Sequence, residues 1–306
     1  MKRLKILFVT KDFSQYLERN FYYFQLELAK FADLQVWHQP GEMSDILRLL
    51  PFTPDFILFN DRFHSTHCPE VGGIEDLKIP WGMIMHDLHG KVDLRRQFLS
   101  KKPTPVIFTI YRQAFIDKYP EYKGKVRWLP HFAEPSVFYD YKLPKVTDLL
   151  LMGCINRRVY PLRYLMRNTY LKREGFVYHK HPGYGNFTEL SPIADNFAKE
   201  INLAKIFLTC DSILQYPLRK YFEVPACNTL LLAPSNEDLL ALGFKSEKNF
   251  VAVNEHDFEE KVSFYLRPDN DSQRLRIAQQ GYEFVHQNHS TAVRVQQLLQ
   301  MIRELV

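Results

Sequence analysis

Short apolar runs alternate with longer amphipathic stretches along the whole chain. Residues 6–10 and 56–60 are almost entirely apolar, whereas residues 21–31 repeat Phe and Leu at helical spacing. Apolar strands that alternate with helices are typical of a parallel sheet that is buried on both faces. The pattern therefore predicts an α/β fold with doubly wound sheets.

The alternation occurs twice, which predicts two domains. Strands are expected in the first half at residues 6–10, 34–37, 56–60, 81–85, 106–109 and 126–129. In the second half, strands are expected at residues 148–152, 176–179, 206–209, 229–232 and 250–253, and helices at 161–173, 192–203, 257–266, 272–285 and 291–305. A polar segment at residues 139–147 separates the halves. We expect domains at residues 1–140 and 148–290, a linker at 141–147, and a terminal helix at 291–306 that packs back towards the first domain.

Composition narrows the class of protein. The start of the chain has no signal-peptide pattern, and no run of about 18 apolar residues occurs, which favours a cytoplasmic protein with at most peripheral membrane contact. The four cysteines lack paired or metal-type spacing, so reduced thiols are expected. The net charge of +5 comes from scattered residues rather than a basic tail, so no nucleic-acid partner is expected.

The most informative stretch is residues 217–232, PLRKYFEVPACNTLLL. It resembles the carboxy-terminal signature of GT-B glycosyltransferases, in particular the branch of spore-maturation-protein-like transferases. Lys220, Phe222, Glu223 and Ala226 match the pattern, and Asn228 stands where the family has glycine. Asn is a tolerable replacement because it enters the left-handed region more readily than other non-glycine residues.

The resemblance covers most of residues 148–299 and implies two facing Rossmann-like domains with a cleft between them. It implies transfer of a sugar from a UDP- or GDP-linked donor, which is a co-substrate, with no separate cofactor. Glu223 would accept the hydrogen bonds of the ribose diol. Retaining relatives carry a second Glu eight positions earlier, where this chain has Gln215. The acceptor, whether glycan, protein, lipid or small molecule, is not identified.

Other donor-binding candidates follow the strands of the second half, where open parallel sheets bind ligands. Gly153 would let the backbone approach the donor, and basic side chains would stabilise the diphosphate leaving group as its charge grows. The loop after residue 179 would cover the base or ribose, although Pro-Gly also marks an ordinary turn. The further donor-binding candidates are Arg157, Arg158, His181, Gly183, Tyr184, Arg219, Lys220, Tyr221 and Phe222.

In the first half, His86 and Asp87 follow a predicted strand and are the candidate catalytic residues. Retaining GT-B enzymes often carry a His in a similar place that touches the donor sugar. A His beside an Asp is also suited to act as a general base, which keeps inversion of configuration open. The acceptor-side candidates are Asp61, Arg62, His64 and His89.

No metal site is expected, because neither the histidines nor the cysteines have convincing ligand spacing. Asp269 and Asp271 mimic the Asp-x-Asp metal motif of another transferase fold, but their position favours a helix cap. Phosphate-binding and dinucleotide-binding glycine motifs are also missing from the sequence, which argues against a nucleotide hydrolase or oxidoreductase. Two alternatives stay open: a noncatalytic nucleotide-sugar-binding protein and a nucleotide-sugar epimerase.

Overall fold

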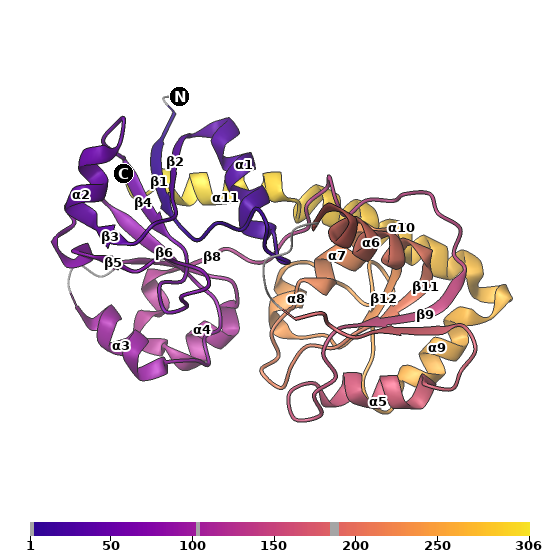
Figure 1. The fold of residues 1–306 in the computed structure, drawn as a ribbon. Helices are drawn as coiled ribbons and strands as arrows, with labels where there is room; N and C mark the ends of the chain where they lie inside the picture. Colours follow the sequence, from indigo (N-terminus) through magenta and orange to yellow (C-terminus); the bar gives the residue numbers. More distant parts are fainter. Residues whose placement is uncertain (1–2, 102–104, 184–189) are drawn as a thin grey trace. The chain divides into compact units, whose positions relative to one another are not determined.

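The computed structural model describes residues 3–101, 105–183 and 190–306, the side chains of 190–195 excepted (Figure 1). The chain forms two compact units. The first comprises Met1–Ser14, Glu18–Pro130 and Arg294–Val306, and the second comprises Gln15–Leu17 and His131–Val293. The division thus falls before the polar segment at residues 139–147.

The first unit is built on a six-stranded sheet in the order β2-β1-β4-β6-β7-β8, in which every pair is parallel. Its strands are β1 (Lys5–Val9), β2 (Asp33–Trp37), β4 (Phe56–Phe59), β6 (Trp81–Met85), β7 (Val106–Thr109) and β8 (Val126–Trp128). A small second sheet pairs β3 (Gly41–Glu42) with β5 (Val71–Gly72). The helices are α1 (Asn20–Phe31), α2 (Met43–Leu49), α3 (Val92–Ser100) and α4 (Arg112–Lys118).

The second unit is built on a five-stranded parallel sheet in the order β10-β9-β11-β12-β13. Its strands are β9 (Thr147–Met152), β10 (Phe176–His179), β11 (Ala204–Leu208), β12 (Leu230–Ala233) and β13 (Val251–Ala252). Its helices are α5 (Pro161–Tyr170), α6 (Leu190–Leu203), α7 (Lys220–Ala226), α8 (Glu237–Ala241), α9 (Phe258–Leu266) and α10 (Asp271–Asn288). Helix α11 (Thr291–Arg303) begins in this unit, and its residues from Arg294 onwards belong to the first.

The inner strands of both main sheets are buried, as their apolar runs require, whereas β2, β8 and β10 at the sheet edges are partly buried. All four residues of β4 and all five of β6 are buried, and so are the central residues of β9 and β11. Every strand expected from the sequence is present, with ends that differ from the expected ones by at most two residues. Helices α2, α3 and α4 lie in the gaps between strands where the strand–helix alternation predicts helices, although the sequence did not give their bounds. The short helix α8 was not predicted.

Strand order fixes where a ligand site is expected in each unit. In the first unit, β2 pairs with one side of β1 and β4 with the other side. In the second unit, β10 and β11 flank β9 in the same way. The direction in which successive strands are added across the sheet therefore reverses between β1 and β4 in the first unit, and between β9 and β11 in the second. Ligands of open α/β sheets bind beyond the carboxyl ends of the strands at such a switch point. Within the described residues, no helix is both long and apolar enough to cross a membrane.

Candidate functional site

Gly153 follows β9 directly, at the switch point of the second unit. Its φ of +124° lies in a region that side chains rarely adopt, and a Cβ atom there would lie 3.4 Å from Arg163 Nη1 and 3.6 Å from Lys220 Nζ. The backbone N–H of Gly153 donates to the carbonyl of His179 over 3.0 Å. The glycine thus brings bare backbone between two cationic side chains.

Arg163 holds its positive charge at the ends of β9 and β11. The side chain comes from α5, is 2% exposed, and donates to the carbonyl of Cys154 over 2.9 Å. It also donates to Thr209 Oγ1 over 3.2 Å and to the carbonyl of Cys210 over 2.7 Å. These acceptors are neutral, so they orient the guanidinium without cancelling its charge.

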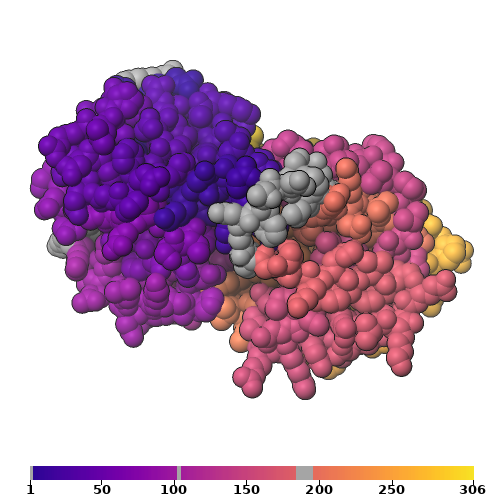
Figure 2. Space-filling model, in the orientation of Figure 1, coloured from indigo at the N-terminus to yellow at the C-terminus, as the bar shows by residue number. Residues whose placement is uncertain are grey.

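Sequence reasoning missed Arg163 and named Arg157 and Arg158 instead. Both of these lie exposed in the turn after β9, a part of the chain that is coloured rose in the surface view (Figure 2). Arg163 shares the buried face of α5 with Met166 and Tyr170, at the spacing of a core stripe. An arginine inside an apolar stripe was therefore the available signal.

Lys220 begins α7 and is the second cation beside Gly153. Its pKa is lowered to about 8, chiefly by burial and then by the charge of Arg163, while Glu223 raises it and Arg219 lowers it. Burial also lowers the pKa of His181, with Lys220, Arg219 and Arg163 as the next causes. The structure therefore brings His181 and Arg219 into the same electrostatic neighbourhood as Lys220. We define the cation group as Arg163, Arg219 and Lys220.

Helix α7 also carries Glu223, Tyr221 and Phe222. Glu223 lies in the first turn, is 5% exposed, and is close enough to Lys220 to affect its pKa. Tyr221 and Phe222 face the core: the Tyr221 hydroxyl donates to the carbonyl of Pro234 over 2.8 Å, and the Phe222 ring meets the Phe244 ring at a centroid distance of 5.6 Å. These two side chains are fully buried and anchor the helix, and the donor contact expected of them stays a prediction.

The remaining candidates of the second unit occupy turns. Gly183 donates its backbone N–H to Nδ1 of His181 over 3.0 Å, while Tyr184 lies outside the described residues. Asn228 has a φ of 52°, which confirms that asparagine takes a left-handed position where the family has glycine. Its side-chain amide donates to Asp140 Oδ2 over 2.9 Å. Gln215 is exposed and also left-handed, with a φ of 55°.

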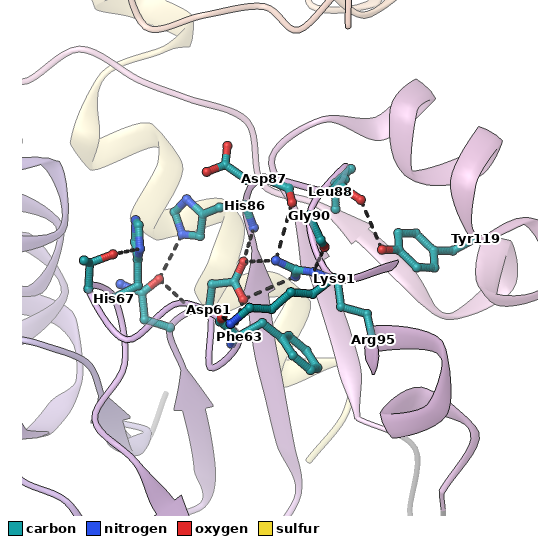
Figure 3. Close-up of polar contacts among 12 residues, drawn as sticks. Asp61, Phe63, His67, His86, Asp87, Leu88, Gly90, Lys91, Arg95 and Tyr119 are labelled. Atoms are coloured by element: carbon teal, nitrogen blue, oxygen red, sulfur yellow. Dashed lines mark hydrogen bonds and ion pairs between the residues drawn. The ribbon is translucent and has the colours of Figure 1, made fainter. Parts of the chain in front are cut away.

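The first unit places His86 one strand away from its switch point, because His86 follows β6 and β6 pairs with β4. His86 is 9% exposed (Figure 3). Its Nε2 lies 2.9 Å from Asn60 Oδ1. Its ring packs against those of Phe21 and His67, at centroid distances of 5.0 and 4.6 Å. Asn60 follows β4 and was missed by sequence reasoning, which looked to Asp87 as the partner of the histidine. Asp87 is exposed, and its carbonyl accepts the N–H of Gly90 over 3.1 Å.

Asp61 is buried, which corrects its expected role as an acceptor-side residue. Both Asp61 and Arg95 have fully buried side chains, and the ion pair between them measures 2.9 Å. The carboxylate also accepts the backbone N–H of His86 over 2.9 Å and that of Phe63 over 3.1 Å. A carboxylate so fully engaged stabilises its own unit and has no exposed surface for a ligand.

Of the other acceptor-side candidates, His89 is exposed and the rest are partly buried. Arg62 stacks on the Phe98 ring at 4.4 Å, and burial lowers its pKa. His64 lies beside His67 at a ring distance of 5.6 Å. Over the described part of the chain, no group of three or more His, Cys, Asp or Glu residues could hold a metal ion. Asp271 begins α10 and pairs with Arg274.

Comparison with known proteins agrees with this architecture. Residues 175–300 match the family described as glycosyl transferase-like. A comparison with curated protein sequences finds no match. Sucrose-phosphate synthase from Thermosynechococcus elongatus is a similar solved structure, with 13% identity, 99% of each chain covered and a TM-score of 0.62. Anabaena HepE in complex with UDP-glucose is similar at 10% identity, with 99% of this chain and 100% of that chain covered and a TM-score of 0.64.

A glycosyltransferase from Rickettsia africae is also similar, at 10% identity, with 99% of each chain covered and a TM-score of 0.61. These likenesses extend over both units of the chain. The chain has the GT-B fold of glycosyltransferases, and its matched family segment contains Lys220 and Glu223 of the candidate site.

Proposed function

We propose that this protein is a glycosyltransferase whose second unit binds a nucleotide-sugar donor. The observation that carries the proposal is the cation group around Gly153, at the switch point of a GT-B unit. Arg163 is held there by neutral acceptors, and Lys220 has a pKa lowered to about 8. A bound diphosphate would supply the negative charge that this neighbourhood favours.

The same cations suit the chemical step. When the bond between sugar and diphosphate breaks, negative charge grows on the leaving group. Side chains already fixed at that place stabilise the charge without reorganisation, so we propose a reaction that needs no divalent cation. Glu223 would accept hydrogen bonds from the ribose hydroxyls, and His181 with Gly183 would border the nucleoside.

The first unit would supply the remaining chemistry through His86. We propose that its imidazole accepts a hydrogen bond or a proton from a hydroxyl of the transferred sugar or of the acceptor. The resemblance of residues 217–232 to retaining transferases supports a reaction with retention of configuration. Solved structures of HepE with UDP and with UDP-glucose make a UDP-linked donor the first to test.

A thermal-shift screen tests donor binding directly. A ligand that binds only the folded state adds about 2.7 kcal/mol to the free energy of unfolding at a concentration one hundred times its Kd, and it thereby raises the melting temperature. We expect a rise with UDP and UDP-glucose, tested beside GDP-, ADP- and CDP-sugars. If no nucleotide raised the melting temperature, the proposed donor site would be wrong.

Product analysis then identifies the reaction. Incubation of the bound donor with pooled acceptors should yield a glycoside whose anomeric configuration NMR can compare with that of the donor. Binding without hydrolysis or transfer over long incubation would instead favour a noncatalytic nucleotide-sugar-binding protein. A changed sugar in the absence of acceptor would favour an epimerase.

A further inference from the structure

A chain of buried hydrogen bonds in the first unit ends on the ring of His86. The hydroxyl of Thr10 donates to the carbonyl of His67 over 3.2 Å, and Nδ2 of Asn60 donates to Thr10 Oγ1 over 3.0 Å. Asn60 Oδ1 accepts the backbone N–H of Asp61 over 2.9 Å and lies 2.9 Å from Nε2 of His86. Thr10 and Asn60 are both fully buried, so water does not compete for these contacts.

The direction of every bond in this chain is determined. The single hydroxyl proton of Thr10 is directed to a carbonyl, so its oxygen can only accept from Asn60. The reversed amide would place the Asn60 NH2 group against the N–H of Asp61, where two donors would meet. Asn60 Oδ1 therefore faces His86, and Nε2 of His86 must carry the proton that it donates. In a neutral imidazole this leaves Nδ1 as the acceptor nitrogen.

A second set of contacts fixes the backbone that carries the ring (Figure 3). Asp61 accepts the N–H of His86, and its partner Arg95 donates through Nε to the carbonyl of Gly90 over 3.0 Å. The hydroxyl of Tyr119 donates to the carbonyl of Leu88 over 3.1 Å. The loop after β6 is thus tied down at both its beginning and its end.

We propose that Asn60 is a positioning residue that locks His86 as the Nε2–H tautomer, and that the Asp61–Arg95 pair fixes the backbone beneath it. Nδ1 is then the nitrogen that receives a hydrogen bond or a proton from a sugar hydroxyl. This inference rests on the proposed function only for the identity of the hydroxyl.

The chemistry balances within these residues. If a proton is transferred, the hydroxyl O–H bond breaks, a bond forms between Nδ1 and hydrogen, and the ring becomes an imidazolium. Its charge stays on the ring, because a neutral amide oxygen such as Asn60 Oδ1 is too weak a base to take the Nε2 proton. The neighbouring His67 has a lowered pKa, chiefly through burial, with Glu18, Asp61 and Asp87 acting against that and His64 with it. A neutral His67 adds no competing charge.

NMR of histidine-labelled protein measures the tautomer directly. The spectra are recorded at pH 8–9, because an ordinary imidazole titrates at about 6.5. We expect long-range 1H–15N correlations to show a protonated Nε2 and an unprotonated Nδ1 for His86. The His86→Gln variant assigns the signals. A wild-type His86 protonated on Nδ1 would overturn the proposal, and this measurement needs no variant to fold.

The Asn60→Ala variant tests the positioning role. Both ring nitrogens of His86 should move towards the intermediate shifts of two exchanging tautomers, and kcat should fall roughly tenfold or more with the donor Kd unchanged. Thr66→Ala is the matched control, since Thr66 contacts Nδ1 of His67 over 3.0 Å and should change only the signals of that ring. A single Nε2–H tautomer in folded Asn60→Ala protein would overturn the role of Asn60. An Nε2–H tautomer in wild-type protein that transfers no sugar would contradict the proposed function alone.

Discussion

The two switch points have the same strand order and opposite electrostatics. In the first unit, the buried cation Arg95 is paired with the buried carboxylate Asp61, and the polar groups around them satisfy one another. In the second unit, the buried cation Arg163 donates its hydrogen bonds only to neutral acceptors, and Lys220 also lies beside Gly153. The first cation is paired with a carboxylate, whereas the second has neutral hydrogen-bond acceptors, which is why we propose that an anion binds beside it.

The difference shows how one architecture can serve two tasks. A buried charge that lacks a partner is expensive, so a fold retains one only where something compensates for it. In the second unit a diphosphate would provide that compensation each time the donor binds. In the first unit the internal pairing fixes the orientation of a single imidazole, which is what an acceptor nitrogen needs in order to meet a hydroxyl with the correct geometry.

The largest expected effect comes from removing the imidazole of the first unit. His86→Ala should lower kcat by about 10² to 10⁴ if the ring transfers a proton, because that is the usual contribution of a general base. The affinity for UDP should stay within twofold, since the proposed nucleotide site lies in the second unit. Steady-state kinetics and calorimetry measure the two quantities separately, with His256→Ala at an exposed position as control. Loss of UDP affinity without loss of turnover would reverse the roles of the units.

The next effect concerns the carboxylate of α7. Glu223→Gln keeps the shape of the side chain and removes its charge, so the ribose hydroxyls lose a charged acceptor. Such a loss costs about 1.5 to 3 kcal/mol, which is on the order of ten- to a hundred-fold in Kd for UDP. Calorimetry on the folded variant, beside the exposed control Glu247→Gln, gives the answer. A Kd within twofold of wild type would show that Glu223 does not bind the ribose.

Sequence reasoning found the fold, and the roles that it gave to site residues stay predictions. The parallel strands were predictable because long apolar runs are a strong local signal, and Asn228 was expected in the left-handed region where the structure has it. The role of Glu223 stays a prediction. Arg163 and Asn60 were missed because their importance depends on which strand ends lie side by side, and a one-dimensional pattern does not contain the strand order.

Burial also explains why some residues that the sequence placed in the sites lie in the core instead. Asp61 was expected to meet an acceptor, because polar residues after a strand so often bind ligands. Its partner Arg95 lies on α3, and the sequence pattern did not show that the two side chains form a buried ion pair. Similarly, Tyr221 and Phe222 were grouped with Lys220 by adjacency, whereas helical geometry turns them into the core.

A pH titration sharpens the contrast by testing whether Lys220 faces the ligand. The lysine is charged below its pKa of about 8 and neutral above it, so the affinity for UDP should fall as pH rises through 8. The affinity should decrease by up to about tenfold between pH 7 and pH 9. This is the limit when binding requires one protonated lysine, because only about a tenth of the lysine is charged one pH unit above its pKa. Calorimetry at each pH measures it.

Lys145 offers a matched control for this titration. Burial lowers its pKa to about 8 as well, but its Nζ donates to Thr229 Oγ1 over 2.7 Å, and these two residues precede β9 and β12 rather than follow strands. Lys145 therefore lies at the amino-terminal ends of the strands of the same sheet, whereas the switch-point site lies at their carboxyl ends. Lys220→Met should flatten the pH dependence, and Lys145→Met should preserve it. If Lys145→Met flattened the pH dependence and Lys220→Met preserved it, the titrating group would be Lys145, and the proposed role of Lys220 would be wrong.

The smallest expected effect is that of a chelator. If the cation group neutralises the diphosphate, excess EDTA should leave donor affinity and turnover within about twofold of their values, because no metal charge is lost. Lys220→Ala and Arg219→Ala should instead depress turnover more than they weaken ground-state binding, since the leaving group is most charged in the transition state. The measurement is a transfer or donor-hydrolysis assay of the three proteins with and without chelator. Activity that disappears with EDTA and returns with magnesium or manganese, while both variants stay fully active, would contradict the proposed role of the cation group. It would also direct attention to Asp269 and Asp271, the second of which begins α10 and is paired with Arg274.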